Sequence, residues 1–440
     1  MTLTRRLPTL AASFAALLVL SACGQAATGP SGSDESTTEP EGQGSSTAQS
    51  EAVEVDTLDP RLVLTYEGGV MTLDTGSGEV IDDAPLEGYL RVNQAGDGRH
   101  VLVTTTEGFR VYDTGLEAQE HGDHHHYYAS DPRLTDLVLP ADHGGHVVSH
   151  DGTTALFADG SGEVTLFDPA ELTDGEPRTE SWTAPEPHHG VAVPLSDDSM
   201  AVSVGNEEAA TGAALIGPDG EEAAATDRCP GLHGEATAED EAIVFGCEDG
   251  PVILRDGEFT KVDVEEDYAR SGNLSGDHDS PIVLGDYKVD PDAELERPER
   301  IALIDTRDAS LELVDLGASY SFRSIARGPE GEALVLTTDG SLRVIDEESG
   351  EEVRSIDVVE PWEEPVEWQQ ARPAIHVADG IAYVTEPASS QVHAVDLASG
   401  EVVRSYDLPH APDEITSGTG FPAGAEEHGE HDHGEEHEDH

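Results

Sequence analysis

Residues 333–346 read ALVLTTDGSLRVID. An apolar stretch runs into an Asp-Gly turn, and a second alternating stretch follows and ends in Asp. Alternation of apolar and polar residues around a turn dipeptide predicts a pair of antiparallel strands. The same unit occurs at 147–168 and at 381–396. Between Leu58 and Leu408 it recurs at intervals of roughly 40 to 50 residues, so the chain is predicted to be all-β and built from repeats.

A repeat of this length with four short strands is typical of a β-propeller blade. The first repeat, near Leu58, lacks an opening strand, and we expect residues after Leu408 to supply it and close the ring. We predict eight blades, with seven as the alternative because two copies are irregular. The copies begin near Leu58, Gly88, Gly144, His188, Cys229, Gly272, Ser319 and Ala371.

The N-terminus reads as an export signal. Arg5 and Arg6 precede an apolar stretch, Leu7 to Leu20, that is too short for an ordinary membrane span. It ends in Leu-Ser-Ala-Cys at residues 20–23, which resembles the lipobox of bacterial lipoproteins. The resemblance implies cleavage before Cys23 and a lipid anchor on its sulfur, outside the cytoplasm. The alternative is an ordinary secretory signal with a chance cysteine.

The remaining domain boundaries follow from composition. Residues 23–55 are rich in Gly, Ser, Thr and Glu and are predicted to be a flexible linker. Residues 56–420 form the predicted propeller. Residues 421–440 are predicted to be a disordered tail, in which five histidines stand among acids and supply weak metal ligands.

The net charge of −70, from 92 acidic against 22 basic residues, excludes nucleic acid as a natural partner because phosphates would be repelled. The acids are spread over every predicted loop, which is typical of a solubilised exterior. Single acidic runs therefore carry no functional prediction.

Two cysteines remain besides Cys23. Cys229 and Cys247 flank two candidate strands, 232–237 and 242–245, joined by a polar turn. Antiparallel strands bring their outer ends together and export permits oxidation, so we predict a disulfide. A thiolate metal site is the weaker alternative, because two isolated cysteines lack the paired spacing of a zinc cage.

Histidines recur at the openings of successive repeats. His146, His189, His233 and His376 each stand where the first strand of a blade begins. Because first strands line the channel of a propeller, these side chains are predicted to converge on one funnel. Neutral imidazole is a general ligand for zinc and its neighbours. The alternative is that each histidine is a lone polar residue on a loop.

A second histidine signal is the stretch 121–128. His124 and His126 are two apart and so point the same way in an extended chain, as two ligands of one ion require, and His121 precedes them. We expect this segment to lie over the funnel, where one or two funnel histidines would complete a four-ligand zinc site. A flexible, weakly binding loop is the alternative, and Cu²⁺ or Ni²⁺ would fit the same residues.

The stretch HGDHHHYY at 121–128, followed by Pro140 and by His146-Val147-Val148, resembles the exported β-propeller zinc metallochaperones of Azt-type zinc ABC transporter systems. The resemblance implies Zn²⁺ as the bound metal and the transporter's solute-binding protein as the partner. It implies His124 and His126 as ligands, with His146 as a neighbour.

We accordingly expect a monomer that is not an enzyme. The sequence has no phosphate loop and no nucleophile elbow. Two alternatives remain open: a hydrolase or lactonase that uses a metal at the funnel, and an interaction scaffold without a metal.

Overall fold

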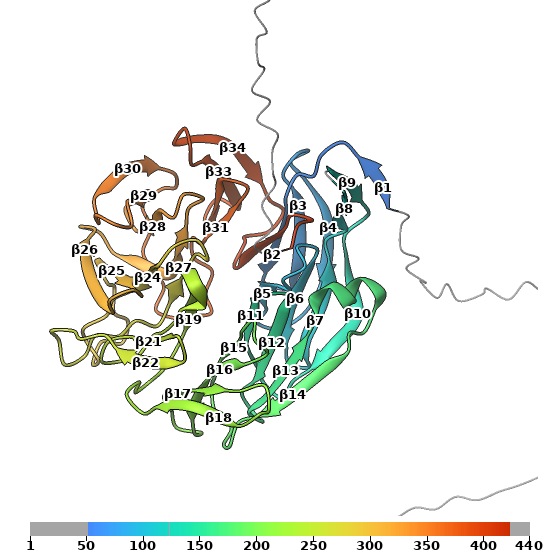
Figure 1. Cartoon of the computed structure of the whole chain (residues 1–440). Helices are drawn as coiled ribbons and strands as arrows, with labels where there is room; N and C mark the ends of the chain where they lie inside the picture. The colour runs from blue at the N-terminus through green and yellow to red at the C-terminus, as the bar shows by residue number, and fades with distance from the viewer. Residues whose placement is uncertain (1–51, 123, 423–440) are drawn as a thin grey trace, which may run out of the picture. The chain divides into compact units, whose positions relative to one another are not determined.

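The computed structural model describes residues 52–122 and 124–422. In this part of the chain, eight four-stranded antiparallel sheets stand around a central axis (Figure 1), and each sheet forms one blade. The prediction of an eight-bladed β-propeller is therefore confirmed, and the alternative of seven blades is wrong. The predicted signal peptide, the predicted lipidation site Cys23 and the five tail histidines lie outside the described residues.

Each blade runs from an inner strand at the central axis to an outer strand at the rim. In that order, blade 1 contains β35 (Ile415–Gly418), β2 (Arg61–Tyr66), β3 (Gly69–Asp74) and β4 (Glu79–Pro85), and blade 2 contains β5 (Arg91–Gln94), β6 (His100–Thr105), β7 (Gly108–Asp113) and β10 (Arg133–Pro140). Blade 3 contains β11 (Gly144–His150), β12 (Thr153–Ala158), β13 (Glu163–Phe167) and β14 (Thr179–Thr183), and blade 4 contains β15 (Ala192–Pro194), β16 (Met200–Gly205), β17 (Ala210–Ile216) and β18 (Glu222–Thr226).

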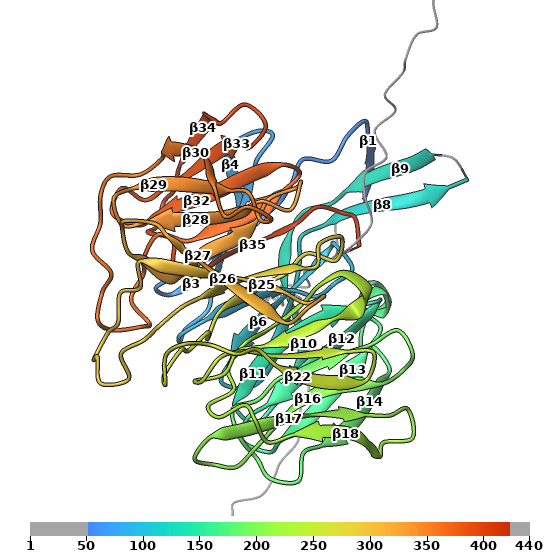
Figure 2. The same cartoon turned by 60° about the vertical axis from the view of Figure 1, so that its left-hand side comes forward.

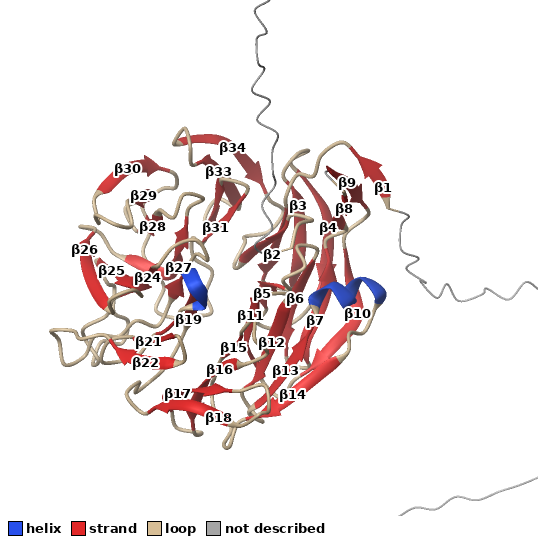
Figure 3. Cartoon of the chain, viewed as in Figure 1, coloured by secondary structure: helices blue, strands red, loops and turns tan. Residues whose placement is uncertain are grey.

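The second half of the ring follows the same plan. Blade 5 contains β19 (Glu235–Thr237), β20 (Ile243–Phe245), β21 (Val252–Arg255) and β22 (Glu258–Lys261), and blade 6 contains β23 (Leu274–Ser275), β24 (Ile282–Asp286), β25 (Arg300–Asp305) and β26 (Ser310–Asp315). Blade 7 contains β27 (Tyr320–Arg327), β28 (Ala333–Thr337), β29 (Ser341–Ile345) and β30 (Glu352–Asp357), and blade 8 contains β31 (Ile375–Ala378), β32 (Ile381–Glu386), β33 (Gln391–Asp396) and β34 (Glu401–Asp407). The described helices are two short 3₁₀ turns, η1 (Pro169–Asp174) and η2 (Glu239–Glu241) (Figure 3).

The ring is closed by its two ends. β35, near the C-terminus, pairs antiparallel with β2, and the register runs from Arg61 opposite Gly418 to Leu64 opposite Ile415. The opening strand that the first repeat lacks is therefore supplied from beyond Leu408, as predicted. Closure gives β2 its second neighbour and completes the four strands of blade 1.

The hydrophobic core lies between neighbouring sheets. One cluster joins Leu62 and Met71 of blade 1 to Tyr383 and Val392 of blade 8, all at most 3 % exposed. Each sheet buries one of its faces against the preceding blade and the other against the following blade. Every blade therefore depends on its neighbours for its hydrophobic core.

The chain direction defines two faces of the propeller. Inner strands begin at the face where each outer strand connects to the next blade, which we call the funnel face. They end at the opposite face, which also carries the connections from the third to the fourth strand. We call this one the hairpin face.

One addition to the repeat stands on the hairpin face (Figure 2). β8 (Leu116–His121) and β9 (His124–Ala129) form a hairpin between the third and fourth strands of blade 2, and β1 (Val53–Val55) pairs with β9. The expectation that this segment lies over the funnel is wrong, because β10 follows it as the outer strand of blade 2. β1 also falls inside the segment predicted to be a linker.

Two further sequence-based predictions have outcomes in the fold. Cys229 and Cys247 form a disulfide, as predicted, and both are fully buried. No helix within residues 52–122 and 124–422 is long and apolar enough to cross a membrane.

Candidate metal centres

Three histidines from three neighbouring blades meet at the funnel face. His146 lies near the start of β11, His189 in the connection that leads to β15, and His233 in the connection that leads to β19. The ring centroids lie 5.1 to 5.7 Å apart, and one nitrogen of each ring lies within 4.8 Å of the others. We call this group the funnel triad. The sequence-based prediction that these three residues converge is in agreement with this arrangement.

Each ring of the funnel triad is oriented by a hydrogen bond from its Nδ1 atom. The acceptors are Glu235 Oε2 for His146 at 3.3 Å, Asp159 Oδ2 for His189 at 2.6 Å, and the Gly272 carbonyl for His233 at 2.7 Å. An oxygen that can only accept fixes the proton on Nδ1 and leaves the lone pair on Nε2. This is the outer-shell arrangement of metal-binding histidines.

The environment keeps the deepest ring of the triad neutral. Burial lowers the pKa of His233 to about 4, with a smaller contribution from the neighbouring His146. The hydrogen bond to the Gly272 carbonyl acts in the opposite direction and raises this pKa. A neutral imidazole is the form that binds a metal ion, so protons compete weakly for His233 near neutral pH.

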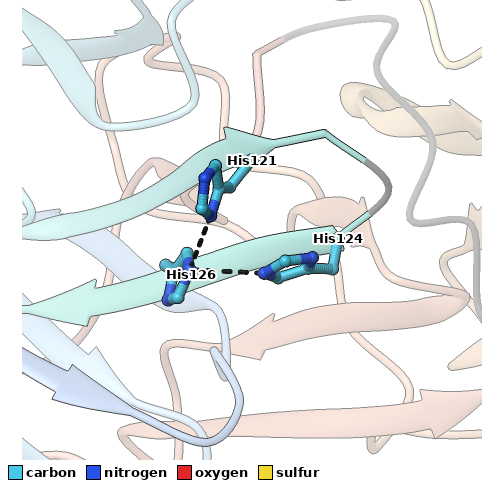
Figure 4. A group of neighbouring side chains, drawn as sticks. All are labelled: His121, His124 and His126. Atoms are coloured by element: carbon cyan, nitrogen blue, oxygen red, sulfur yellow. Dashed lines mark hydrogen bonds between the residues drawn. The ribbon is translucent and has the colours of Figure 1, made fainter.

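The second group lies on the β8–β9 hairpin. His121, His124 and His126 bring their rings together on one side of the two strands (Figure 4), and we call them the hairpin triad. His126 Nε2 lies 3.2 Å from His121 Nδ1 and 3.3 Å from His124 Nε2. His126 Nδ1 lies 2.8 Å from Glu54 Oε1 of β1. His121 and His124 are exposed and His126 is partly exposed, so the site is open to solvent.

The two triads lie on opposite faces of the propeller. The funnel triad stands where inner strands begin, whereas the hairpin extends from the connection between β7 and β10. Backbone bonds anchor the hairpin to that face, since Ala118 N donates to Gly420 O and Gly420 N donates to Gly98 O, which lies in the turn after β5. The prediction of one mixed site is therefore corrected to two separate sites, and His146 is not a neighbour of His124 and His126.

His376, the fourth predicted funnel ligand, is in neither triad. Its Nε2 atom lies 2.8 Å from Ser417 Oγ, which joins β31 to the closing strand β35. Burial lowers the pKa of His376 to about 4. The side chain therefore belongs to the closure of the ring.

Among the described residues, one more group of potential ligands exists. Asp277, His278 and Asp279 follow one another in the turn between β23 and β24. The carboxylate of Asp277 already accepts the backbone N–H of Asp279, as is usual for a turn aspartate. The funnel and hairpin triads are the better candidates because their ligands come from separate strands or blades.

Sequence reasoning missed the acceptors that orient the rings. The sequence contains 92 acidic residues, and nothing in it distinguishes Asp159 or Glu54 from the others. Glu235 is the one acceptor with a recognisable position, because it follows His233 by two residues. The Gly272 carbonyl carried none, because backbone oxygens have no sequence signature.

His376 provides a stability test. A histidine whose pKa falls on folding stabilises the protein above its unfolded pKa of roughly 6.5, and this contribution is lost as the pH falls toward 4. The variant His376→Gln should therefore lose less stability between pH 7 and pH 5 than the wild type, with zinc binding unchanged. Chemical denaturation at the two pH values measures this, and the exposed His143→Gln is the matched control. Equal pH dependence in wild type and variant would contradict the assignment.

Comparisons with known proteins agree with this fold. No protein-family model matches the chain. The zinc chaperone AztD of Citrobacter koseri is 29% identical over 350 residues, which are 74% of this chain and 77% of the relative. The crystal structure of Citrobacter koseri AztD superposes with a TM-score of 0.72 at 25% identity, over 82% of this chain and 99% of that one. The structure of apo AztD from Citrobacter koseri superposes with a TM-score of 0.70 at 24% identity, over 82% of this chain and 98% of that one.

The fold also occurs in an enzyme. Dihydro-heme d1 dehydrogenase NirN superposes with a TM-score of 0.55 at 13% identity, over 87% of this chain and 80% of that one, which shows the fold alone. The resemblance of the sequence motifs to the exported β-propeller zinc metallochaperones is confirmed by the likeness to AztD in both sequence and structure.

Proposed function

We propose that this protein is an extracytoplasmic zinc metallochaperone that delivers Zn²⁺ to the solute-binding protein of a zinc ABC transporter. The observation that carries the proposal is the funnel triad, whose three rings are already oriented by Glu235, Asp159 and the Gly272 carbonyl. The likeness to the zinc chaperone AztD supports zinc as the cargo.

Three imidazole ligands suit a site that holds zinc and still exchanges it. Zinc prefers four ligands, so a three-histidine site leaves one position for a ligand from elsewhere. The side chain of His189 is 48% exposed, which leaves the site accessible from the funnel face. Its partners His146 and His233 are more deeply buried. The funnel triad therefore combines two partly buried ligands, His146 and His233, with one solvent-accessible ligand, His189.

The hairpin triad suits handover. Its rings contact one another directly and stand on a projecting sheet, where Glu54 adds a carboxylate beside His126. Exposed ligands exchange one at a time with those of an acceptor that docks against them. We assign tight retention to the funnel triad and transfer to the hairpin triad.

The sequence supplies the rest of the proposal. The export signal and lipobox place the protein outside the cytoplasm, anchored through Cys23. The chain enters the described body at β1, beside the hairpin triad. The histidine-rich tail, which lies outside the described residues, would collect zinc weakly.

Zinc transfer in the presence of a trap tests the proposal. The zinc-loaded protein is mixed with the metal-free solute-binding protein of the zinc ABC transporter of the same organism, together with a chelator that captures free Zn²⁺. Direct transfer should continue, and the double variant His124→Ala, His126→Ala should slow it at least about tenfold, since each lost ligand is a large part of a four-ligand sphere.

Two controls accompany this experiment. Deletion of residues 426–440 should lower only the number of weakly bound ions and leave transfer intact. If the chelator stops transfer by the wild type, the protein is a buffer that releases zinc to solution, and the chaperone proposal fails. If variants of the hairpin triad transfer zinc at the wild-type rate, the hairpin triad has no part in transfer and that assignment fails.

A metal-dependent hydrolase is the second candidate. Three histidines with one open position and a nearby carboxylate, in this site Glu235, also form the metal site of hydrolytic zinc enzymes. Turnover of a panel of lactones and esters by the zinc-loaded protein, lost in His146→Ala, would favour this function over zinc delivery.

A further inference from the structure

We propose that the Cys229–Cys247 disulfide is a positioning device for the funnel triad: it holds the peptide that carries His233, so that the zinc site exists before zinc arrives. The inference rests on the proposed function only in taking the funnel triad as a zinc site. It adds a role for two residues that do not touch the metal.

The contacts of His233 lead directly to the disulfide. Cys229 lies four residues before His233, in the same connection between blades 4 and 5. The backbone N–H of His233 donates to the Gly246 carbonyl at 3.0 Å, and the N–H of Gly246 donates back to Gly234 O at 3.1 Å. Gly246 immediately precedes Cys247. The disulfide therefore ties together the two chain segments whose mutual hydrogen bonds hold His233.

The acceptor for the His233 ring belongs to the same assembly. Its Nδ1 atom donates to Gly272 O, and the N–H of Ser271 donates to Cys247 O at 3.3 Å. The carboxylate of Asp286 holds this segment from the other side by accepting the N–H of Gly272 at 2.6 Å and the N–H of Asn273 at 3.0 Å. Both the backbone and the ring of His233 are thus placed relative to Cys247.

The backbone segments around His233 are packed so closely that two positions accept no side chain. A Cβ atom at Gly246 would lie 2.0 Å from Ser271 O and 2.8 Å from His233 O. Gly234, which follows His233, has φ +80°, and a Cβ atom there would lie 2.6 Å from Gly272 O. Glycine is required at both positions, because the three segments approach one another at backbone distance.

Without the disulfide, these contacts would have to hold the connection unaided. Opening the cross-link frees a loop closed over a sequence separation of 18 residues. If His233 then occupies its binding position only one tenth of the time, the apparent zinc affinity of the triad falls about tenfold. A site completed by His146 and His189 alone would bind zinc with a different ligand set.

The test removes the disulfide where the funnel triad alone is observed. In a background with His121, His124 and His126 replaced by alanine and residues 426–440 deleted, the variant Cys229→Ser, Cys247→Ser is titrated with Zn²⁺ against a competing chelator. We expect at least about tenfold weaker binding, together with a changed absorption spectrum of the Co²⁺-loaded protein. The core variant Val395→Ala in blade 8, which destabilises the ring far from the triad, should leave both measurements unchanged.

A second variant covers the case in which the cysteine variant does not fold. The variant Cys229→Ala, Cys247→Ala removes the disulfide without leaving buried hydroxyl groups in the core, and it should weaken zinc binding to a similar extent. Unchanged affinity and Co²⁺ spectrum in a folded variant that lacks the disulfide would overturn the positioning role. Absence of zinc binding by the parent background would instead contradict the funnel triad itself, so the two failures are distinguishable.

Discussion

Replacing His146 and His233 with alanine should lower the zinc affinity of the funnel triad by more than about a hundredfold. Loss of a partner that only orients a metal-binding histidine typically lowers affinity about 10- to 100-fold, and loss of two ligands should exceed that range. The two rings are also the more buried members of the triad. His189, exposed and alone, would remain as a weak surface ligand.

The measurement is a competition titration with a zinc chelator in the background that lacks the hairpin histidines. The control His143→Ala removes a histidine of the same face whose side chain is 83% exposed and pairs with the neighbouring Asp142. It should leave the affinity unchanged. The variant Glu235→Gln, which keeps His146 but replaces the acceptor of its Nδ1 proton, should give a smaller loss of about tenfold. Equal zinc binding by all these variants would exclude the funnel triad as the tight site.

Truncation after Leu408 should abolish the cooperative unfolding transition of the propeller. The truncated chain lacks β35, so β2 loses its partner from Arg61 to Leu64. It also lacks Asp413 and Glu414, whose carboxylates pair with Arg323, a side chain only 7% exposed. A buried charge left without its partners costs about 3–5 kcal/mol. Together with the lost pairing, this is comparable to the entire stability of a typical domain, about 5–15 kcal/mol.

Truncation after Pro422 is the matched control, because it keeps every described contact of β35. Its melting temperature, followed by circular dichroism, should equal that of the full chain. A truncation after Leu408 that still melts cooperatively near the wild-type temperature would show that the clasp contributes little to stability.

Local sequence patterns determined the architecture of this protein. Alternating apolar residues around Asp-Gly turns specify strands, and their recurrence specifies blades, since each strand buries one face against a neighbour. The missing strand of the first repeat pointed to closure by the C-terminal segment, because the first blade needs a fourth strand beside β2. The disulfide followed from strand pairing. Convergence of His146, His189 and His233 followed from their equivalent positions in consecutive blades.

Only the tertiary structure decided how the histidines divide into sites. The face on which the hairpin stands depends on whether one strand or none remains in blade 2 after it. The sequence did not distinguish β10 from the opening strand of blade 3. His376 lies within β31 of blade 8, away from blades 3 to 5, whereas His189 and His233 lie in the connections that precede their inner strands. Its ring pairs with Ser417 instead of joining the funnel triad. The acceptors Glu235, Asp159 and Gly272 O come from separate parts of the chain. Their placement is set by long-range packing, which no local pattern in the sequence records.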